Sequence, residues 1–326
     1  MKKTQNNLII IVLILILILV VMLSISQGEI DISFSESLKA LLNKSTSFNN
    51  NVVNKIRLPR VVVGICVGVA LSLSGLITSI ALKNPLADSG ILGIQSGATI
   101  GALIAILVLP SMIIYLPIFS FIGGIVVFLL LLLITVGKNG YSSKNIVLSG
   151  VAMNAFATSI TGTIAIVYAD RFKNALGWLN GSLSTISVTD MKVILIYTTI
   201  LVIIILFFIP VIKILMLDDN AILNIGHNPN VLRFILTLLA VLLACISVAF
   251  VGVIAFIGII APQISRKLVG VNIGYLIVSS VLIGAILVVG TDLLQRIIFS
   301  PMEVPVGILI GVIGAPMFII LARRKS

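Results

Sequence analysis

Residues 8–23 read LIIIVLILILILVVML, an unbroken run of sixteen apolar residues that follows Lys2 and Lys3. A helix that crosses a bilayer needs about 20 mostly apolar residues, and residues 8–26 supply that length. The run also resembles a secretory signal peptide, because Ser24-Ile25-Ser26 forms a small-x-small end. We favour an uncleaved first span, since the run is long for a signal peptide and later apolar segments have the same character.

Composition places most of the chain in lipid. Of its 326 residues, 60% are hydrophobic and 10% are charged, and the mean hydropathy is +1.30. A soluble domain carries about 25% charged residues, so this chain lacks the polar surface that water requires. The 21 basic and 10 acidic residues give a net charge of +11. The basic residues lie in ones and twos between apolar runs, which indicates membrane topology and not a nucleic-acid partner.

Glycine, proline and charged residues divide the chain into ten candidate transmembrane helices. This pattern predicts an all-α membrane protein with a single transmembrane domain over residues 1–326. The eighth candidate is short and contains Pro262. The ten ranges are 8–26, 58–81, 91–109, 117–136, 145–168, 191–213, 233–251, 253–268, 274–292 and 305–322.

An even number of spans places both ends of the chain on one side of the membrane. If that side is the cytoplasm, the inner segments hold 12 basic and three acidic residues, and the outer segments hold nine and seven. Lysine and arginine are enriched in cytoplasmic loops. The sequence therefore predicts that both termini are cytoplasmic.

The predicted spans contain almost no charge. Asp292 and Arg266 lie at helix ends, and no ionisable residue lies near a span centre. Such a group is costly and usually marks a proton relay or ion pathway, so its absence disfavours a proton-driven pump. Glycine pairs four residues apart are predicted to pack helices closely within one subunit, with a dimer seam as the alternative. The pairs are Gly64 and Gly68, Gly97 and Gly101, and Gly307 and Gly311.

Patterns for catalysis or cofactor binding are missing from the sequence. It has no HExxH, GxSxG or GxxxxGK[ST] motif, and its one histidine, His227, lies in a polar loop. Cys66 and Cys245 lie inside apolar runs and form no CxxC pair. We therefore expect no catalytic residue, cofactor or metal site. If ATP drives this protein, the ATPase must be another chain.

Residues 217–231, LDDNAILNIGHNPNV, form a polar loop on the predicted inner side. Asp218 and Asp219 precede a short run from Ala221 to Ile225, and Gly226 is a typical helix stop. Two short helices at the membrane surface would satisfy this pattern, and so would a solvated connector.

Arginines flank spans two and nine on the predicted outer side. Arg57 and Arg60 open span two, and Arg296 follows span nine. Arginine at an interface commonly reaches lipid phosphates. It also forms bidentate pairs with carboxylates, so a docking partner is the second interpretation.

A polar stripe follows one face of span five. Asn154, Thr158 and Thr161 are spaced i, i+4 and i+7, which places them on the same side of a helix. Such residues either line a wet path or hydrogen-bond to neighbouring helices.

Short motifs follow one another from residue 57 to the end of the chain. They are Arg57-Leu58-Pro59-Arg60, Leu73-Ser74-Gly75, Asn84-Pro85-Leu86-Ala87-Asp88, Leu92-Gly93-Ile94, Ser96-Gly97-Ala98, GVIAFIG at 252–258, Ala261-Pro262 with Arg266, Pro305-Val306-Gly307 and Gly314-Ala315-Pro316. In this order they resemble the permease family of iron-chelate and cobalamin ABC importers, the FecCD type. Any one motif alone would be weak evidence.

The resemblance implies ten helices per subunit in two inverted five-helix halves. It further implies a two-fold pair of permeases, two cytoplasmic ATPase subunits that drive them, and an extracellular binding protein that delivers the cargo. Gly75 and Pro85 are ten residues apart, as are Gly252 and Pro262, which is consistent with two related halves.

The resemblance also implies roles for particular residues. The loop 217–231 corresponds to the coupling helices that contact the ATPase, with Asp218, Asp219, Ala221, Ile225 and Gly226. The three outer arginines correspond to those that pair with glutamates of the binding protein. Ser142 and Ser143, in the loop 141–144, correspond to the cytoplasmic gate. Span five, with Asn154, Thr158 and Thr161, then lines the translocation path.

These expectations describe the permease subunit of an ATP-driven importer in the plasma membrane of a bacterium. Ferric siderophores are the favoured cargo because iron chelates are the commonest cargo of the family, and haem and cobalamin are alternatives. The second permease is either identical or a paralogue. An ion-gradient-driven secondary transporter is the alternative from another class. Gln263 departs from the family, which usually has histidine there, so a titrating role at that position is not expected.

Overall fold

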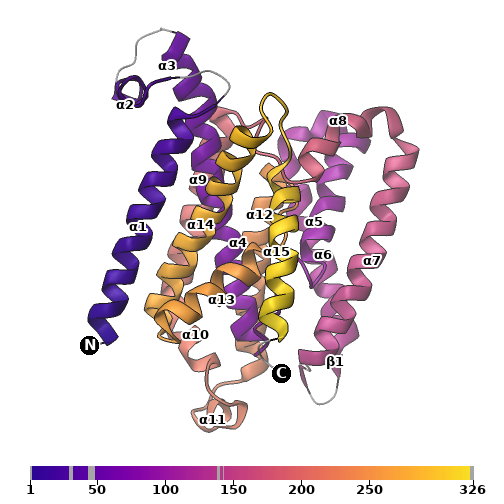
Figure 1. Ribbon diagram of the computed structural model, residues 1–326. Coiled ribbons are helices and arrows are strands. Elements are labelled where there is room, and N and C mark those ends of the chain that lie inside the picture. Colours follow the sequence, from indigo (N-terminus) through magenta and orange to yellow (C-terminus); the bar gives the residue numbers. More distant parts are fainter. Residues whose placement is uncertain (1, 29–31, 43–47, 138–139, 142, 324–326) are drawn as a thin grey trace.

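Long helices run side by side through the computed structural model (Figure 1). The structure describes residues 2–28, 32–42, 48–137, 140–141 and 143–323. Each of the ten predicted spans falls on a helix. These helices are α1 (Lys2–Ser26), α4 (Leu58–Ala81), α5 (Ile94–Leu103), α6 (Leu116–Thr135), α7 (Ser143–Val167), α9 (Val188–Phe207), α12 (Pro229–Val251), α13 (Ile257–Val269), α14 (Ile273–Ile298) and α15 (Val306–Arg323).

Shorter elements connect the long helices. A two-residue antiparallel hairpin pairs β1 (Val136–Gly137) with β2 (Gly140–Tyr141). The short helices are α2 (Phe34–Leu42), α3 (Phe48–Val52), α8 (Ala169–Leu179), α10 (Ile209–Leu215) and α11 (Asp219–Asn224), with π-helical turns η1 (Val53–Arg57) and η2 (Ile104–Val108) and the 3-10 turn η3 (Pro110–Tyr115).

The helical content confirms the all-α membrane fold. Among the described residues, seven helices are long and apolar enough to cross a membrane, and shorter apolar helices cover 94–108 and 306–320. Helix α13 has 13 residues and contains Pro262, as the sequence suggested. Large apolar side chains of α1 are exposed, including Leu8 and Leu15. Exposed apolar faces of this kind suit contact with lipid and not with water.

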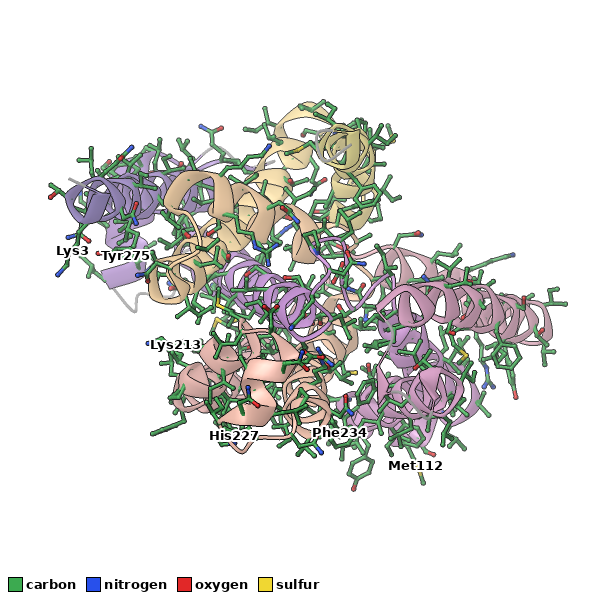
Figure 2. All side chains as sticks on the ribbon, turned by 90° about the horizontal axis from the view of Figure 1, so that it is seen from below. Lys3, Met112, Lys213, His227, Phe234 and Tyr275 are labelled. Atoms are coloured by element: carbon green, nitrogen blue, oxygen red, sulfur yellow. The ribbon has the colours of Figure 1, made fainter. Side chains whose placement is uncertain are left out.

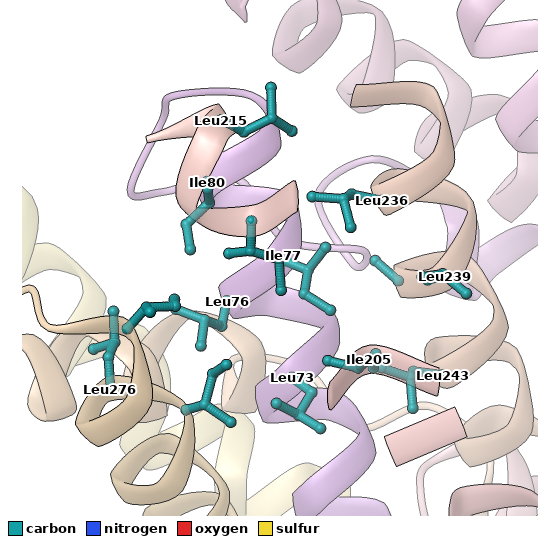
Figure 3. Close-up of a cluster of buried hydrophobic side chains, with 14 of the residues drawn as sticks. Leu73, Leu76, Ile77, Ile80, Ile205, Leu215, Leu236, Leu239, Leu243 and Leu276 are labelled. Carbon is teal, nitrogen blue, oxygen red and sulfur yellow. The ribbon is translucent and has the colours of Figure 1, made fainter. Parts of the chain in front are cut away.

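Helix α4 is the centre of the bundle. Pro59 lies in its first turn, a position that suits proline, and nearly all of the helix's residues are buried. Figure 3 shows its Leu73, Leu76 and Ile77 among side chains of α9, α12 and α14. Because lipid tails are as apolar as leucine, this cluster stabilises the bundle through close packing more than through removal from water.

Glycines let neighbouring helices approach α4 closely. A Cβ atom on Gly68 would overlap the backbone of Gly284 in α14, and one on Gly75 would overlap the backbone of Gly258 in α13. The predicted packing role is confirmed for Gly64, Gly68, Gly97, Gly101 and Gly307, each of which faces another segment of this chain. Gly311 is different, since a Cβ there would meet no described atom within 4 Å.

Two of the helices begin inside the bundle. Helix α4 is followed by the segment 82–93 and then α5, and α12 is followed by the segment 252–256 and then α13. Both α5 and α13 start after a residue in the left-handed region, Gly93 with φ 77° and Phe256 with φ 67°. Helix α4 ends near α11, whereas α12 starts there. The unit formed by α4 and α5 therefore runs in the opposite direction to the unit formed by α12 and α13, as expected for inverted halves.

The two ends of the bundle differ. Helix α1 starts, α15 stops and α11 lies at one end, named here the α11 end; α2, α3 and α8 lie at the other, named the α8 end (Figure 1). Figure 2 looks along the bundle from the α11 end, with Lys3, Lys213 and His227 among the labelled residues.

Candidate functional site

The loop 217–231 contains one short helix, α11, whereas the two interpretations of its sequence were two short helices and a solvated connector. Asp218 precedes it in extended conformation, and Gly226, with φ 83°, follows its last turn. The predicted helix stop at Gly226 is therefore confirmed, because a left-handed residue is a common way to end a helix. After Gly226 the long helix α12 begins, where Asn228 accepts a hydrogen bond from the Asn230 N–H and Pro229 takes the first helical position.

One carboxylate joins α11 to the membrane helices. Asp219 Oδ1 accepts a hydrogen bond from Lys83 Nζ at 2.8 Å, and both Asp219 oxygens accept from Arg233 Nη2 at 2.7 and 2.9 Å. Lys83 Nζ also donates to the Leu217 carbonyl at 2.8 Å, and Arg233 Nε donates to the Ala81 carbonyl at 3.1 Å. We call Lys83, Asp219 and Arg233 the ion triad. It ties α11 to the end of α4 and the first turns of α12.

The five predicted coupling residues divide into two groups. Asp219 and Ala221 are half-buried and belong to the side of α11 that meets the bundle, whereas Asp218, Ile225 and Gly226 are exposed. Leu217 and Leu223 were not predicted, yet both are also exposed large apolar residues at this end. Lys83 and Arg233 were missed as well, because in the sequence they look like ordinary positive charges at helix ends.

The ion triad predicts a pH dependence. Burial opposes ionisation of Asp219, but hydrogen bonds and charges from Lys83 and Arg233 outweigh it and lower the pKa of Asp219 below 3.8. A lowered carboxyl pKa stabilises the folded state above the ordinary value, and that stability is lost as pH falls through the folded value. The melting temperature of Asp219→Asn should therefore be lower than that of wild type at pH 7. The two melting temperatures should converge as pH falls below 3.8.

The neighbouring Asp218→Asn is the matched control for that titration. Asp218 is exposed and has no ion pair in the described part of the chain. At pH 7 the melting temperature of this variant should stay close to that of wild type. A stability difference for Asp219→Asn that persists unchanged to acid pH would contradict the ion triad.

The three predicted docking arginines are buried at the α8 end. Arg57 is 5% exposed and donates to the carbonyls of Ile25 and Ser26 at 2.9 and 2.7 Å. Arg60 Nε donates to both Asp292 oxygens at 2.9 and 3.1 Å, and its Nη1 contacts Glu303 at 2.5 Å. Arg296 Nη2 lies 3.2 Å from Asp292. The structure thus gives these arginines partners within the chain, and a role in docking stays a prediction.

A cavity of about 130 Å³ opens beside these arginines. It is lined by Arg57, Arg60 and Arg296 together with the segment 300–303. Glu303 has 42% of its side chain exposed, whereas Asp292 has 3%. Of the two carboxylates that pair with these arginines, Glu303 is therefore the more accessible from outside the protein.

The polar stripe of α7 is only partly engaged. Asn154 accepts a hydrogen bond from Ser96 Oγ in α5, and its Nδ2 donates to the Gly90 carbonyl at 3.0 Å. Thr158 is exposed and donates to the Asn154 carbonyl at 2.8 Å, and Thr161 is half-buried. Asn154 thus fixes α7 against the segment 82–93, while Thr158 is exposed and Thr161 is only partly covered by this chain. Of the predicted gate, Ser142 lies outside the described residues and Ser143 begins α7.

Asp88 is a buried ionisable residue that lies between two predicted spans and not within one. It is 2% exposed, and a Cβ on Gly258 would lie 2.5 Å from its Oδ1 and 3.0 Å from the carbonyl of Leu71 in the middle of α4. Ser89 Oγ donates to Asp88 Oδ1 at 3.1 Å. Its burial was not predicted, because the segment 82–93 folds back into the bundle.

Gln263 has a clear structural contact. Its Nε2 donates to the Pro85 carbonyl at 2.5 Å, and Arg266, one turn further along α13, contacts Ser79 Oγ at 2.5 Å. Both side chains hold the segment 82–93 and the end of α4 against α13. A hydrogen-bonding residue suffices for this contact, so glutamine in place of histidine serves it.

The described residues contain no group of three or more His, Cys, Asp or Glu side chains that could hold a metal ion. Cys66 and Cys245 are both buried and free.

The whole chain can be compared with known proteins. The model of the FecCD transport family matches residues 15–324. The chain belongs to the FecCD transport family. Two relatives are each 36% identical over 92% of this chain and 90% of their own: the "Probable heme-iron transport system permease protein IsdF" of Staphylococcus aureus (strain MSSA476) and the "Fe(3+)-citrate import system permease protein YfmE" of Bacillus subtilis (strain 168).

A solved structure shares the fold of this FecCD chain. It shows an inward-facing conformation of a transporter assigned to the metal-chelate type of ABC transporter, with a TM-score of 0.84, 25% identity, and coverage of 98% of this chain and 99% of the other. The family resemblance drawn from the motifs is thereby confirmed, as is the fold of an ABC transporter permease. The protein is a multi-pass membrane transport protein, and membership of this family implies ABC partner components.

Proposed function

We propose that this FecCD protein is the permease subunit of an ATP-driven importer of iron chelates, with ferric siderophores as the favoured cargo. The observation that carries the proposal is the match over nearly the whole chain to a haem-iron and a ferric citrate permease. Both cargos are iron bound by an organic chelator. Haem is therefore the nearest alternative cargo, and cobalamin the next.

The α11 end is proposed as the contact with two cytoplasmic ATPase subunits. Helix α11 is fixed to the bundle by Asp219, while Leu217, Leu223 and Ile225 are exposed there by 46%, 56% and 53%. Exposed apolar residues on a short, anchored helix suit burial in a groove of a partner protein. With the ATPases on this side, both termini are cytoplasmic.

The α8 end is proposed to receive the binding protein that delivers the cargo. Glu303 is the more exposed of the two carboxylates beside Arg60. A glutamate of the binding protein that takes the place of Glu303 on Arg60 Nη1 would keep the guanidinium paired. Docking through Arg57, Arg60 and Arg296 then exchanges one carboxylate for another and does not require a bare buried charge.

The path is proposed to run along α7, between this chain and a second, identical or paralogous permease. Thr158 is exposed and Thr161 is partly exposed on α7, and a Cβ on Gly311 of α15 would meet no described atom within 4 Å. A weakly polar wall without charge would let a large polar cargo pass without trapping it. Ser142 and Ser143 are proposed as the cytoplasmic gate, and residues 1–326 as one permease domain.

Reconstitution tests the function. The complete transporter in proteoliposomes should accumulate radiolabelled ferric siderophore only with ATP on the ATPase side, and unlabelled cargo should compete. Ferric citrate, haem and cobalamin, tested in parallel, rank the cargos. Uptake by the permease alone that follows an ion gradient and ignores ATP would show a secondary transporter instead.

A further inference from the structure

The segment 82–93 connects the ion triad with α7. At one end, Lys83 follows the last turn of α4, and its Nζ lies 2.8 Å from Asp219 Oδ1 of α11. At the other, the Gly90 carbonyl accepts a hydrogen bond from Asn154 of α7 at 3.0 Å. A short stretch of backbone therefore separates the helix proposed to contact the ATPase from a residue proposed to line the path.

The backbone at Lys83 is unusual. Its φ is 50°, in the left-handed region that residues with a side chain rarely adopt. Two hydrogen bonds close the turn, from Lys83 N–H to the Ile80 carbonyl and from Asn84 N–H to the Ser79 carbonyl, each at 3.1 Å. Because the same residue makes the turn and holds α11, a shift of α11 acts directly on the direction in which the segment leaves α4.

The middle of the segment is held as firmly as its ends. Gln263 of α13 holds the Pro85 carbonyl, and Asp88 is enclosed beside Gly258. At the far end, a Cβ on Gly150 of α7 would lie 2.7 Å from the Ile91 carbonyl. A segment packed in this way transmits a displacement and cannot absorb it as a flexible loop would.

From these contacts we infer that Lys83 and Arg233 are positioning residues that transmit movement of α11 through the segment 82–93 to α7. The inference rests on the proposed function. Lys83 links α11 to the segment, and Arg233, which is 6% exposed, links the same carboxylate to α12. Without both cations, α11 could move with the ATPase while the path stays in place.

The test uses the complete transporter in proteoliposomes with Lys83→Gln and Arg233→Gln. We expect correct assembly and ATP hydrolysis, but a rise of about 5-fold or more in ATP hydrolysed per cargo molecule, the lower range of typical coupling between sites. Lys83→Arg should restore the wild-type ratio because it keeps the charge. Lys213→Gln is the matched control, since Lys213 is an exposed lysine at the same end without an ion pair among the described residues.

A second measurement does not depend on transport. Spin labels at Leu223 of α11 and Leu86 of the segment should keep one separation with and without ATP in wild type, and change separation with ATP in Lys83→Gln. The inference would be overturned if Lys83→Gln hydrolysed as much ATP per cargo molecule as wild type and also kept the same separation between the two spin labels with and without ATP. Failure of wild type to use ATP for uptake would instead overturn the proposed function.

Discussion

Replacing Gly75 by leucine should abolish the folded protein. A Cβ at this position would overlap the carbonyl group and the Cα of Gly258, so helices α4 and α13 touch backbone to backbone there. Backbone cannot move aside as a flexible side chain can. Ordinary overpacking of a core costs about 1–3 kcal/mol, and an overlap with buried backbone at the centre of the bundle should exceed that range. The measurement is the yield of monodisperse protein in detergent and its melting temperature.

Gly177→Leu is the matched control for this variant. Gly177 is exposed in α8, and a Cβ there would meet nothing within 4 Å. It should give near wild-type yield, with a small gain or loss from helix propensity. Gly75→Ala tests the same contact with the smallest possible side chain and should also lower the melting temperature. Wild-type yield and melting temperature for Gly75→Leu would show that α4 and α13 do not pack in this way.

The sequence allows the helices to be predicted because lipid imposes a simple rule. A spanning helix must be apolar along its length and must satisfy its own backbone hydrogen bonds. The run at 8–23 and the apolar stretch of α4 obey this rule, so both were recognised. The end of α11 could also be predicted from the sequence, since Gly226 adopts the left-handed conformation that ends this helix.

Long-range partners could not be predicted from local patterns. Arg60 pairs with Asp292, which lies 232 residues away, and Lys83 pairs with Asp219, 136 residues away. Each of these charges lies next to a helix end, where a topology signal, a lipid contact and an ion pair look alike in sequence. The burial of Asp88 could not be predicted for a similar reason. Hydropathy does not reveal that the segment after α4 turns back into the bundle, although Gly75 and Gly258 mark the close packing that surrounds it.

Replacing Asp292 by asparagine should destabilise the protein strongly, although the change keeps size and shape. Asp292 lies between Arg60 and Arg296, and the exposed fractions of the three side chains are 3%, 7% and 8%. Asparagine leaves two guanidinium groups close together with Glu303 as the remaining nearby carboxylate. Removing one partner of a buried ion pair costs about 3–5 kcal/mol, because the other charge stays buried without compensation. The expected result is a much lower melting temperature and a much lower yield.

Glu303→Gln is the matched control, because it removes a carboxylate from the same arginine at a position that is 42% exposed. Exposed ion pairs contribute about 0–1 kcal/mol, so this variant should fold normally and should serve to test docking of the binding protein. Arg296→Glu, in contrast, would bring a second carboxylate against Asp292 and should reduce the yield before docking can be measured. Equal stability of Asp292→Asn and Glu303→Gln would mean that the side chains of Arg60 and Arg296 are hydrated. Both arginines would then be available to pair directly with carboxylates of a docking partner.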